Sequence, residues 1–407
     1  MNNEQTTVFP APAAPDATAA PRSLDPRIWL LALGTFAIGT DVFVVSGILS
    51  LMARDLAVGL EAAGLTVTAY AITYALAAPL IVPLVATLDQ RRVVITTLAL
   101  FALGNALCAL APSYELLMMA RIASGLAAAL YTSTAYALAT SLAPANRRGA
   151  ALSAVAVGLT AAAVLGVPIG AAIGQAIGWR ATFWLVAVIS AGAVAALSLR
   201  PRNPPTPPAP VQRQAYRARF APLVQPRVLL ALLPSLLWNT ANLTSYTYLG
   251  TTLAEHHSPQ IVIALFFTYG IGGLIGSQLG GRLLDRFGAT FPLAACLAIA
   301  TLNQALMEVS ALSTLTTALA LILWSITGWA TFAPQQARLM ALSPQNGALL
   351  IALNHSVIYI GFAVGAALGG AAIAQGIAVA KLHWITSGLL ALALLSFAGA
   401  VRREKTC

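Results

Sequence analysis

Long runs of apolar residues, separated by short polar breaks, recur along this chain from residue 28 to residue 401. About 20 consecutive apolar residues are enough for a helix to cross the hydrocarbon core of a bilayer. Strands of an outer-membrane barrel would alternate apolar and polar positions over about ten residues, and these runs do not alternate. The pattern therefore predicts twelve membrane-spanning helices, at residues 28–51, 64–87, 93–111, 115–139, 150–175, 181–200, 228–251, 260–283, 290–310, 314–337, 346–374 and 383–401.

Polar segments divide these helices into two groups of six. Residues 201–227 are rich in proline and arginine, which is typical of an exposed, semi-rigid linker. Residues 1–27 are rich in proline and alanine and lack the basic start and short apolar core of a signal peptide, so we expect them to be disordered. The sequence thus predicts one six-helix bundle over 28–200, a second over 228–401, and a short cytoplasmic tail over 402–407.

The distribution of charge gives the orientation. Apolar residues make up 59% of the chain and charged residues 8%, and the net charge is +10. With the helices above, 18 of the 22 lysines and arginines lie in loops on one side, while Arg54, Arg180 and Lys381 lie on the other. By the positive-inside rule, both termini and the central linker are cytoplasmic. The basic excess is therefore a topology signal and argues against nucleic-acid binding.

The residues that could bind a metal, form disulfides or bind a phosphate lack the spacing that these functions require. Cys108, Cys296 and Cys407 lie in separate segments without the spacing of a metal site or a disulfide framework. Neither lysine, Lys381 or Lys405, follows the glycine pattern of a phosphate-binding loop, which argues against ATP-driven transport by this chain alone. We expect no metal and no cofactor, and we expect a monomer in the lipid bilayer.

One acidic residue, Asp41, lies in the middle of the first predicted helix. A carboxylate at that depth costs at least about 2.5 kcal/mol unless it is paired, faces water or is protonated. Arg121, in the fourth predicted helix, lies at a compatible depth, and a buried arginine stays charged while a buried carboxylate can titrate. We hypothesise that Asp41 is protonated from the outside and releases its proton to the cytoplasm, in competition with substrate. The alternative is a static Asp41–Arg121 pair that only orders the bundle.

Small residues recur every four positions in the second, fifth, eighth and eleventh predicted helices. Gly166, Gly170 and Gly174 follow this spacing in the fifth, and Gly272 and Gly276 in the eighth. Small residues at this spacing let helices approach closely in lipid. Their recurrence in every third helix is expected of two similar halves, each made of two three-helix units.

Several short motifs carry a family resemblance. After the eighth predicted helix, residues 281–288 read GRLLDRFG; residues 121–125 read RIASG, residues 166–170 GVPIG, and residues 178–183 GWRATF. In these segments the chain resembles the major facilitator superfamily and, within it, the twelve-helix drug:proton antiporter group. Residues 36–44 further resemble a subgroup of bacterial sugar and chloramphenicol exporters, which usually carry a glutamate near the position of Asp41.

The resemblance implies an all-α integral membrane fold of two pseudo-symmetric six-helix bundles. It implies proton coupling at Asp41 and Arg121. It also implies gating by the loop after the eighth helix and by its degenerate copy after the second, which has Thr87 where the family has aspartate. The residues are Gly166, Pro168 and Gly170 for the antiporter motif, and Arg91, Arg92, Gly281, Asp285, Arg286 and Gly288 for gating.

Polar and aromatic side chains in the middle of the predicted helices are candidates to bind substrate. An amide in lipid needs a partner, and it finds one either in a watery cavity or on a neighbouring helix. The mixture suits a neutral or weakly charged organic molecule. The candidates are Tyr70, Tyr74, Trp238, Asn239, Asn242, Tyr246, Asn354, His355 and Tyr359, with Tyr131, Gln304 and Trp324 as further possibilities.

Together these features predict a proton-coupled secondary transporter in the cytoplasmic (inner) membrane. It would export small organic compounds, drug-like or sugar-like, by alternating access. Two alternatives remain open: a sugar or metabolite uniporter or symporter, and a non-transporting membrane sensor or scaffold. We do not expect an enzyme, because no cluster of histidines, cysteines or acids converges within the predicted helices.

Overall fold

The computed structural model describes residues 24–85, 88–200, 225–342 and 347–405, and these residues form helices joined by short connections, with no strand. The helices of the N-terminal half are α1 (Pro26–Asp55), α2 (Leu60–Val85), α3 (Gln90–Leu110), α4 (Tyr114–Leu142), α5 (Arg148–Ala161), α6 (Val167–Ile177) and α7 (Trp179–Leu199). A π-helical turn, Ala162–Gly166, joins α5 to α6.

The C-terminal half repeats the arrangement with more interruptions. Its helices are α9 (Pro226–Tyr246), α10 (Leu249–Ala254), α11 (Pro259–Phe287), α12 (Thr290–Ala305), α13 (Met307–Ser310), α14 (Thr314–Ala330), α15 (Phe332–Leu342), α16 (Gly347–Ala374) and α17 (Leu382–Lys405). The sequence predicted α9–α10, α12–α13 and α14–α15 as uninterrupted helices. In the structure each pair is separated by a turn of one or two residues.

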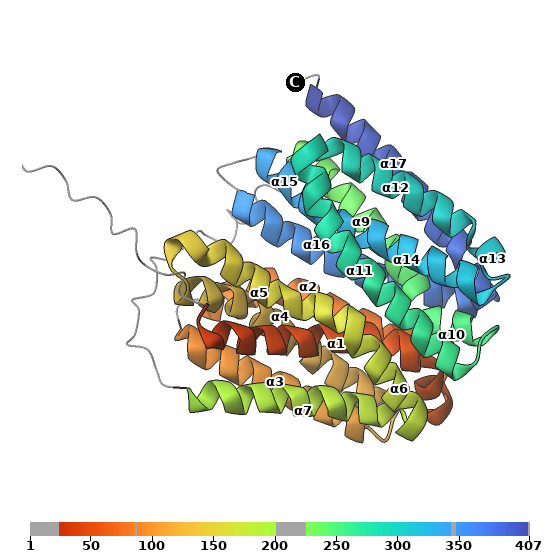
Figure 1. The fold of residues 1–407 in the computed structure, drawn as a ribbon. Coiled ribbons are helices and arrows are strands. Elements are labelled where there is room, and N and C mark those ends of the chain that lie inside the picture. Colours follow the sequence, from red (N-terminus) through yellow and green to blue (C-terminus); the bar gives the residue numbers. More distant parts are fainter. Residues whose placement is uncertain (1–23, 86–87, 201–224, 343–346, 406–407) are drawn as a thin grey trace, which may run out of the picture.

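The helices are those of a multi-pass membrane protein. Among the described residues, eleven helical segments are long and apolar enough to cross a membrane, and a twelfth, Thr290–Ala305, is apolar but shorter. They form two six-helix bundles, which Figure 1 shows as a lower red-to-green group and an upper green-to-blue group. The predicted fold class is confirmed, and the core of each bundle is made of apolar helix faces that pack on one another.

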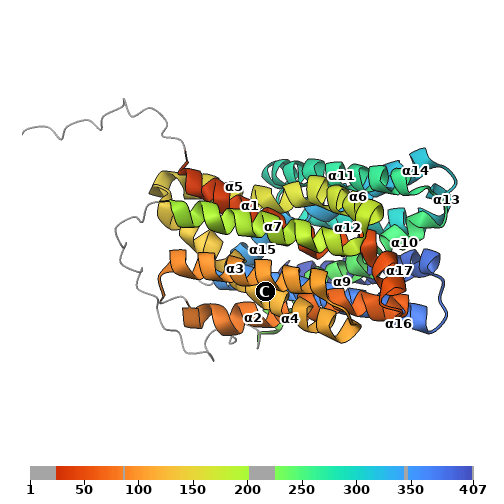
Figure 2. The same ribbon diagram turned by 90° about the horizontal axis from the view of Figure 1, so that it is seen from below.

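The two ends of the molecule differ and need names. We call the end where α1 begins and α7 ends the terminal end, and the end that carries α10 and α13 the distal end; they lie at the left and right of Figures 1 and 2. The predictions for residues 1–23, for most of the linker and for Thr87 lie outside the described residues.

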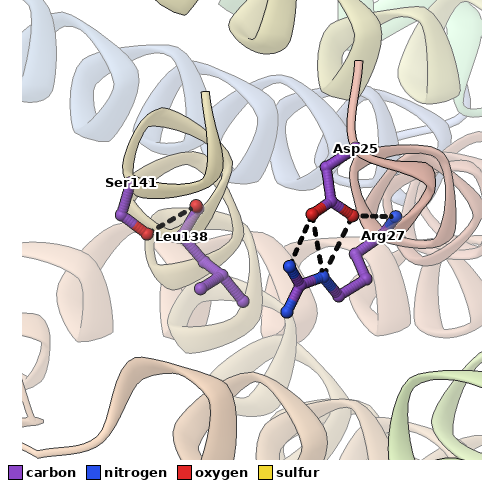
Figure 3. A network of polar contacts seen from close by, with 4 residues as sticks. All are labelled: Asp25, Arg27, Leu138 and Ser141. Carbon is purple, nitrogen blue, oxygen red and sulfur yellow. Dashed lines mark hydrogen bonds and ion pairs between the residues drawn. The ribbon is translucent and has the colours of Figure 1, made fainter. Parts of the chain in front are cut away.

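Asp25 fixes the start of α1 at the terminal end. Its carboxylate accepts the backbone N–H of Arg27 at 2.9 Å and the Arg27 guanidinium at 2.5 Å. Figure 3 shows this pair beside the end of α4, where the Ser141 hydroxyl donates to the Leu138 carbonyl at 2.8 Å. The Arg27 hydrogen bond holds the pKa of Asp25 below its usual value. A carboxylate in this position satisfies an otherwise unpaired N–H of the first turn.

Trp179 and Arg180, in the sequence motif at the start of α7, tie the distal end of the N-terminal bundle together. The Trp179 indole N–H donates to Asp55 Oδ2 at 3.0 Å, and Arg180 forms an ion pair with the same carboxylate. Arg180 also donates to the Ala111 carbonyl at 2.9 Å. The ends of α1 and α3 and the start of α7 are therefore held by one carboxylate and one guanidinium.

The two bundles meet closely from the middle of the molecule to the distal end. A Cβ atom on Gly250 of α10 would lie 2.3 Å from the Ser46 carbonyl of α1, so only glycine permits this approach. Between α2 and α16, the Thr68 hydroxyl donates to the Ala363 carbonyl at 3.1 Å. These contacts hold the bundles together on the distal side of their interface.

Candidate functional site

A fully buried ion pair lies inside the N-terminal bundle. Asp41, in the middle of α1, and Arg121, in α4, are both 0% exposed. Arg121 Nη1 donates to Asp41 Oδ1 at 2.6 Å. The structure thus brings together the acid and the base that the sequence singled out, although the two residues are 80 positions apart in the chain.

Arg121 is enclosed by α2 and α7. Its guanidinium carbon lies 4.4 Å above the centre of the Tyr70 ring and 5.8 Å from the centre of the Phe183 ring. Its Nε is 3.4 Å from the Thr66 carbonyl, a long hydrogen bond. Tyr70 therefore differs from its predicted role, because it packs on Arg121 and lines neither of the cavities described below.

The hydrogen bonding of the pair is incomplete. Asp41 Oδ2 and Arg121 Nη2 are both buried and have no hydrogen-bond partner. A buried polar atom without a partner costs about 1–3 kcal/mol, and more when it is charged. The pair is consequently held in an arrangement with unused hydrogen-bonding capacity, and this is the kind of site where protonation can change the preferred packing.

The antiporter motif packs directly against α1 on both sides of Asp41. A Cβ atom on Gly166 would lie 2.0 Å from the Thr40 hydroxyl, and one on Gly170 would lie 2.5 Å from a Val44 methyl group. Pro168 follows the π-helical turn at the start of α6. Proline has no N–H to continue the helix ladder, and a π-helical turn is a common way to accommodate such a break.

Gly166→Ala should destabilise the protein by about 1–3 kcal/mol, the usual cost of overpacking a well-packed core. The added methyl group would displace Thr40 and with it α1. Gly192→Ala in α7 is the matched control, since no atom lies within 4 Å of that Cβ position. Denaturant unfolding in detergent measures both variants, and equal stabilities would contradict the proposed close contact.

A central cavity lies between the two bundles, with about 980 Å³ of empty space when the part that is open to the surroundings is included. Seven of the nine candidate substrate residues line it, namely Tyr74, Trp238, Asn239, Asn242, Tyr246, His355 and Tyr359. His355 is exposed to this space. Among the described residues that line it there is no aspartate, glutamate, lysine or arginine.

Aromatic rings form much of the cavity wall. The Tyr246 ring lies 5.8 Å from Phe43 and 5.1 Å from Tyr269, measured between ring centres. Tyr74 of α2 and Tyr359 of α16 stack across the two bundles with centres 3.6 Å apart. Aromatic pairs of this kind bury large apolar areas and retain hydroxyl groups for hydrogen bonds. The wall thus combines ring faces with a few hydroxyls and amides.

Several cavity residues escaped the sequence-based prediction. These are Phe43, Tyr136, Tyr269, Trp329, Phe332 and Phe362 among the aromatic residues, and Thr35 and Thr132 among the polar ones. An aromatic residue in a membrane helix faces lipid, packing or cavity without any difference in local sequence. Of the further possibilities, Trp324 donates to Asn242 Oδ1 at 2.6 Å, and Tyr131 donates to the Leu31 carbonyl at 2.9 Å inside the N-terminal bundle.

The ion pair does not line the cavity. Neither Asp41 nor Arg121 is among the residues of its wall, and both are fully enclosed. Direct competition between proton and substrate at Asp41, as the sequence led us to expect, does not match this geometry. Helix α1 nevertheless reaches the cavity, because Thr35, Ile38 and Phe43 lie in its wall on either side of Asp41.

The residues predicted to act in gating lie at the terminal end. Gly288 ends α11 with a φ of +71°, a conformation that favours glycine. Asp285 and Arg286 are exposed, and Arg286 lies 5.2 Å from the centre of the Phe287 ring. Gly281 lies one turn earlier with open space at its Cβ position. Their predicted role in gating stays a prediction.

The degenerate copy of this loop makes contacts within the N-terminal bundle. Arg91 Nη2 donates to the carbonyls of Leu197 and Arg200 at 2.8 and 2.7 Å, at the end of α7. Arg92 lies 3.5 Å from the Asp89 carboxylate. A guanidinium at a helix C-terminus satisfies carbonyls that have no partner within the helix.

Comparison with known proteins gives a consistent picture. The family model of the Major Facilitator Superfamily matches residues 31–366. The inner membrane transport protein YdhP of Escherichia coli (strain K12) is 32% identical over 92% of this chain and 95% of its own length. A chloramphenicol resistance protein of Streptomyces lividans is 35% identical over 64% of this chain and 67% of its own.

A probable sugar efflux transporter of Mannheimia succiniciproducens is 28% identical over 91% of this chain and 92% of its own length. Among solved structures, an inward-facing, unoccupied bacterial homologue of the human lysosomal transporter Spinster has a TM-score of 0.75 at 16% identity. It covers 93% of this chain and 96% of its own. That likeness concerns the fold. The chain belongs to the Major Facilitator Superfamily, and it is a membrane transporter rather than an enzyme.

Proposed function

We propose that this transporter exports small, uncharged organic molecules across the cytoplasmic membrane in exchange for protons. The observation that carries the proposal is the fully buried Asp41–Arg121 pair in the middle of the N-terminal bundle. An ionisable pair inside a membrane bundle is costly and is typical of a proton or ion pathway. The printed names of two relatives, a chloramphenicol resistance protein and a sugar efflux transporter, support export of organic compounds.

Protonation of Asp41 changes the balance of charge inside the bundle. With both side chains ionised the pair is neutral, whereas a protonated Asp41 leaves the Arg121 charge without its counter-ion. Arg121 cannot lose its own proton under ordinary conditions, so the bundle must rearrange to stabilise it. A ligand or proton shifts a conformational equilibrium only by its differential affinity for the two states, and the loss of this ion pair supplies such a difference.

Helix α1 transmits that rearrangement to the substrate. It carries Asp41, lines the cavity with Thr35, Ile38 and Phe43, and meets α10 of the other bundle at Ser46. A shift of α1 therefore alters the pair, the cavity and the distal contact between the bundles together. Proton and substrate then compete through the position of α1 rather than for one site.

The orientation follows from the basic loops at the terminal end. Both termini are placed in the cytoplasm by the positive-inside rule. The cavity then lies on the cytoplasmic side of the closing contacts at Gly250 and Thr68, which suits a carrier that collects its cargo from the cytoplasm. Gating by Asp285, Arg286 and Arg91 at this end is part of the proposal.

Proteoliposomes with an imposed pH gradient test the exchange. With an acidic lumen, the protein should accumulate chloramphenicol or a neutral sugar inside, and a protonophore should abolish the accumulation. Uptake that requires an acidic exterior instead would indicate symport, and flux that ignores the gradient would indicate a uniporter. Either result would contradict proton-coupled export.

A further inference from the structure

A second cavity lies inside the C-terminal bundle, next to the central one. Its empty space, including the part that is open to the surroundings, is about 420 Å³, and α9, α12, α15, α16 and α17 contribute to its wall. Four residues, Trp238, Asn239, Phe332 and Ile358, line both cavities. The second space, which we call the side pocket, is therefore separated from the central cavity only by these shared side chains.

Asn354 is the distinctive polar residue of the side pocket. It is 2% exposed, and its Oδ1 has no hydrogen-bond partner. The neighbouring His355 lines the central cavity instead, because successive residues of a helix point about 100° apart. Asn354 and His355, which are adjacent on α16, thus line two different cavities.

The other two amides of the side pocket already use their N–H groups. Asn239 Nδ2 donates to the Ser235 carbonyl at 2.7 Å, and Gln335 Nε2 donates to the Ala231 carbonyl at 2.9 Å. The amide oxygens of these two residues and Asn354 Oδ1 are the carbonyl-type acceptors among the side chains that line the pocket.

Apart from the hydroxyl residues Ser235 and Thr331, the rest of the wall is apolar. Leu293, Leu297 and Phe397 face the amides across the pocket. The Arg338 guanidinium lies 4.9 Å from the centre of the Phe397 ring, so a positive charge sits behind that part of the wall. A neutral group with a hydrogen-bond donor fits this combination better than a cation does.

We propose that the side pocket is a second substrate subsite that takes a neutral hydroxyl-bearing group, with Asn354 Oδ1 as the hydrogen-bond acceptor. The proposal rests on the proposed function only in assuming that the central cavity holds the substrate. When the shared side chains change conformation, one end of a bound molecule can enter the side pocket between α9 and α16. Rejection of analogues without the hydroxyl then follows, because their binding leaves the amide oxygen unpaired.

Binding of chloramphenicol and of its di-O-methyl derivative to the purified protein in lipid nanodiscs tests the assignment by calorimetry. The wild type should prefer chloramphenicol, and Asn354→Leu should weaken its binding about tenfold, the usual effect of one lost hydrogen bond. Binding of the methylated compound should change less than threefold. Loss of equal size for both compounds, or no binding of chloramphenicol to the wild type, would overturn the assignment.

A second pair of variants guards against a folding defect. Leu297→Trp fills the pocket from α12 and should weaken chloramphenicol binding as Asn354→Leu does. Leu392→Trp, at an exposed position of α17, is the matched control and should bind like the wild type. Weakening by Leu392→Trp equal to that by Leu297→Trp would overturn the assignment. If the variants show these differences in binding but the wild type shows no pH-driven flux, proton coupling alone is refuted. If the wild type shows pH-driven flux but the variants show no such differences in binding, the subsite alone is refuted.

Discussion

Asp41→Asn should abolish transport driven by a pH gradient. Asparagine keeps the size of the side chain and a hydrogen-bond acceptor for Arg121, but it cannot bind and release a proton. We expect gradient-driven flux to fall at least about a hundredfold, toward the rate of liposomes without protein, since the variant lacks the proposed proton-binding step. Flux in proteoliposomes with an acidic lumen measures this directly.

The matched control for this variant is Asp89→Asn. Asp89 is exposed at the terminal end, where its side chain accepts the backbone N–H of Arg91, and asparagine can make the same cap. Its flux should equal that of the wild type. A further check is substrate exchange without a gradient, which Asp41→Asn should retain because Asp41 does not line the cavity. Full gradient-driven flux in Asp41→Asn would refute the coupling role of this residue.

Arg121→Leu should strongly destabilise the protein. It leaves the Asp41 carboxylate buried without a cation, and removal of one partner from a buried ion pair costs about 3–5 kcal/mol. The double variant Asp41→Leu/Arg121→Leu should recover most of that loss, because an apolar pair of similar volume can replace a buried ion pair at little cost. Denaturant unfolding in detergent provides the comparison.

Two conditions sharpen that comparison. Lowering the pH should reduce the loss in Arg121→Leu, since protonation removes the uncompensated charge. Arg54→Leu, an exposed arginine whose Nε donates to the Ser50 carbonyl, should change stability by less than about 1 kcal/mol. A double variant no more stable than Arg121→Leu would mean that the pair is not what sets the stability of this region.

The helices were predictable because lipid leaves few solutions. Each backbone polar group must be satisfied within the helix, so a run of about 20 apolar residues has one stable form. The pairing of Asp41 with Arg121 was predictable because a charge at that depth in the bilayer is costly unless an opposite charge lies beside it. The break at Leu306 was not, because no proline or glycine marks it. The break at Thr331 has a signal in Pro334, which has no N–H to donate to the carbonyl of Ala330, the last residue of α14.

The walls of the cavities were predictable only in part. Asn239, Asn242 and Tyr246 stood out because amides are costly in lipid, whereas Phe43 and Tyr269 look like any lipid-facing or packed aromatic residue. Tyr70 and Tyr74 lie one turn apart on α2 and were predicted together, but the first packs on Arg121 and the second lines the cavity. Such differences depend on which helices are neighbours, and one sequence does not give that.

Helix α1 runs from Pro26 to Asp55 without a break, whereas α5–α6, α9–α10 and α14–α15 are each interrupted. An unbroken helix of 30 residues is stiff along its length, so a push at its centre moves both ends. The interrupted helices can bend and absorb such a displacement. Helix α1 can therefore move as one rigid rod, with Asp41, the residue that we propose binds the proton, at its middle.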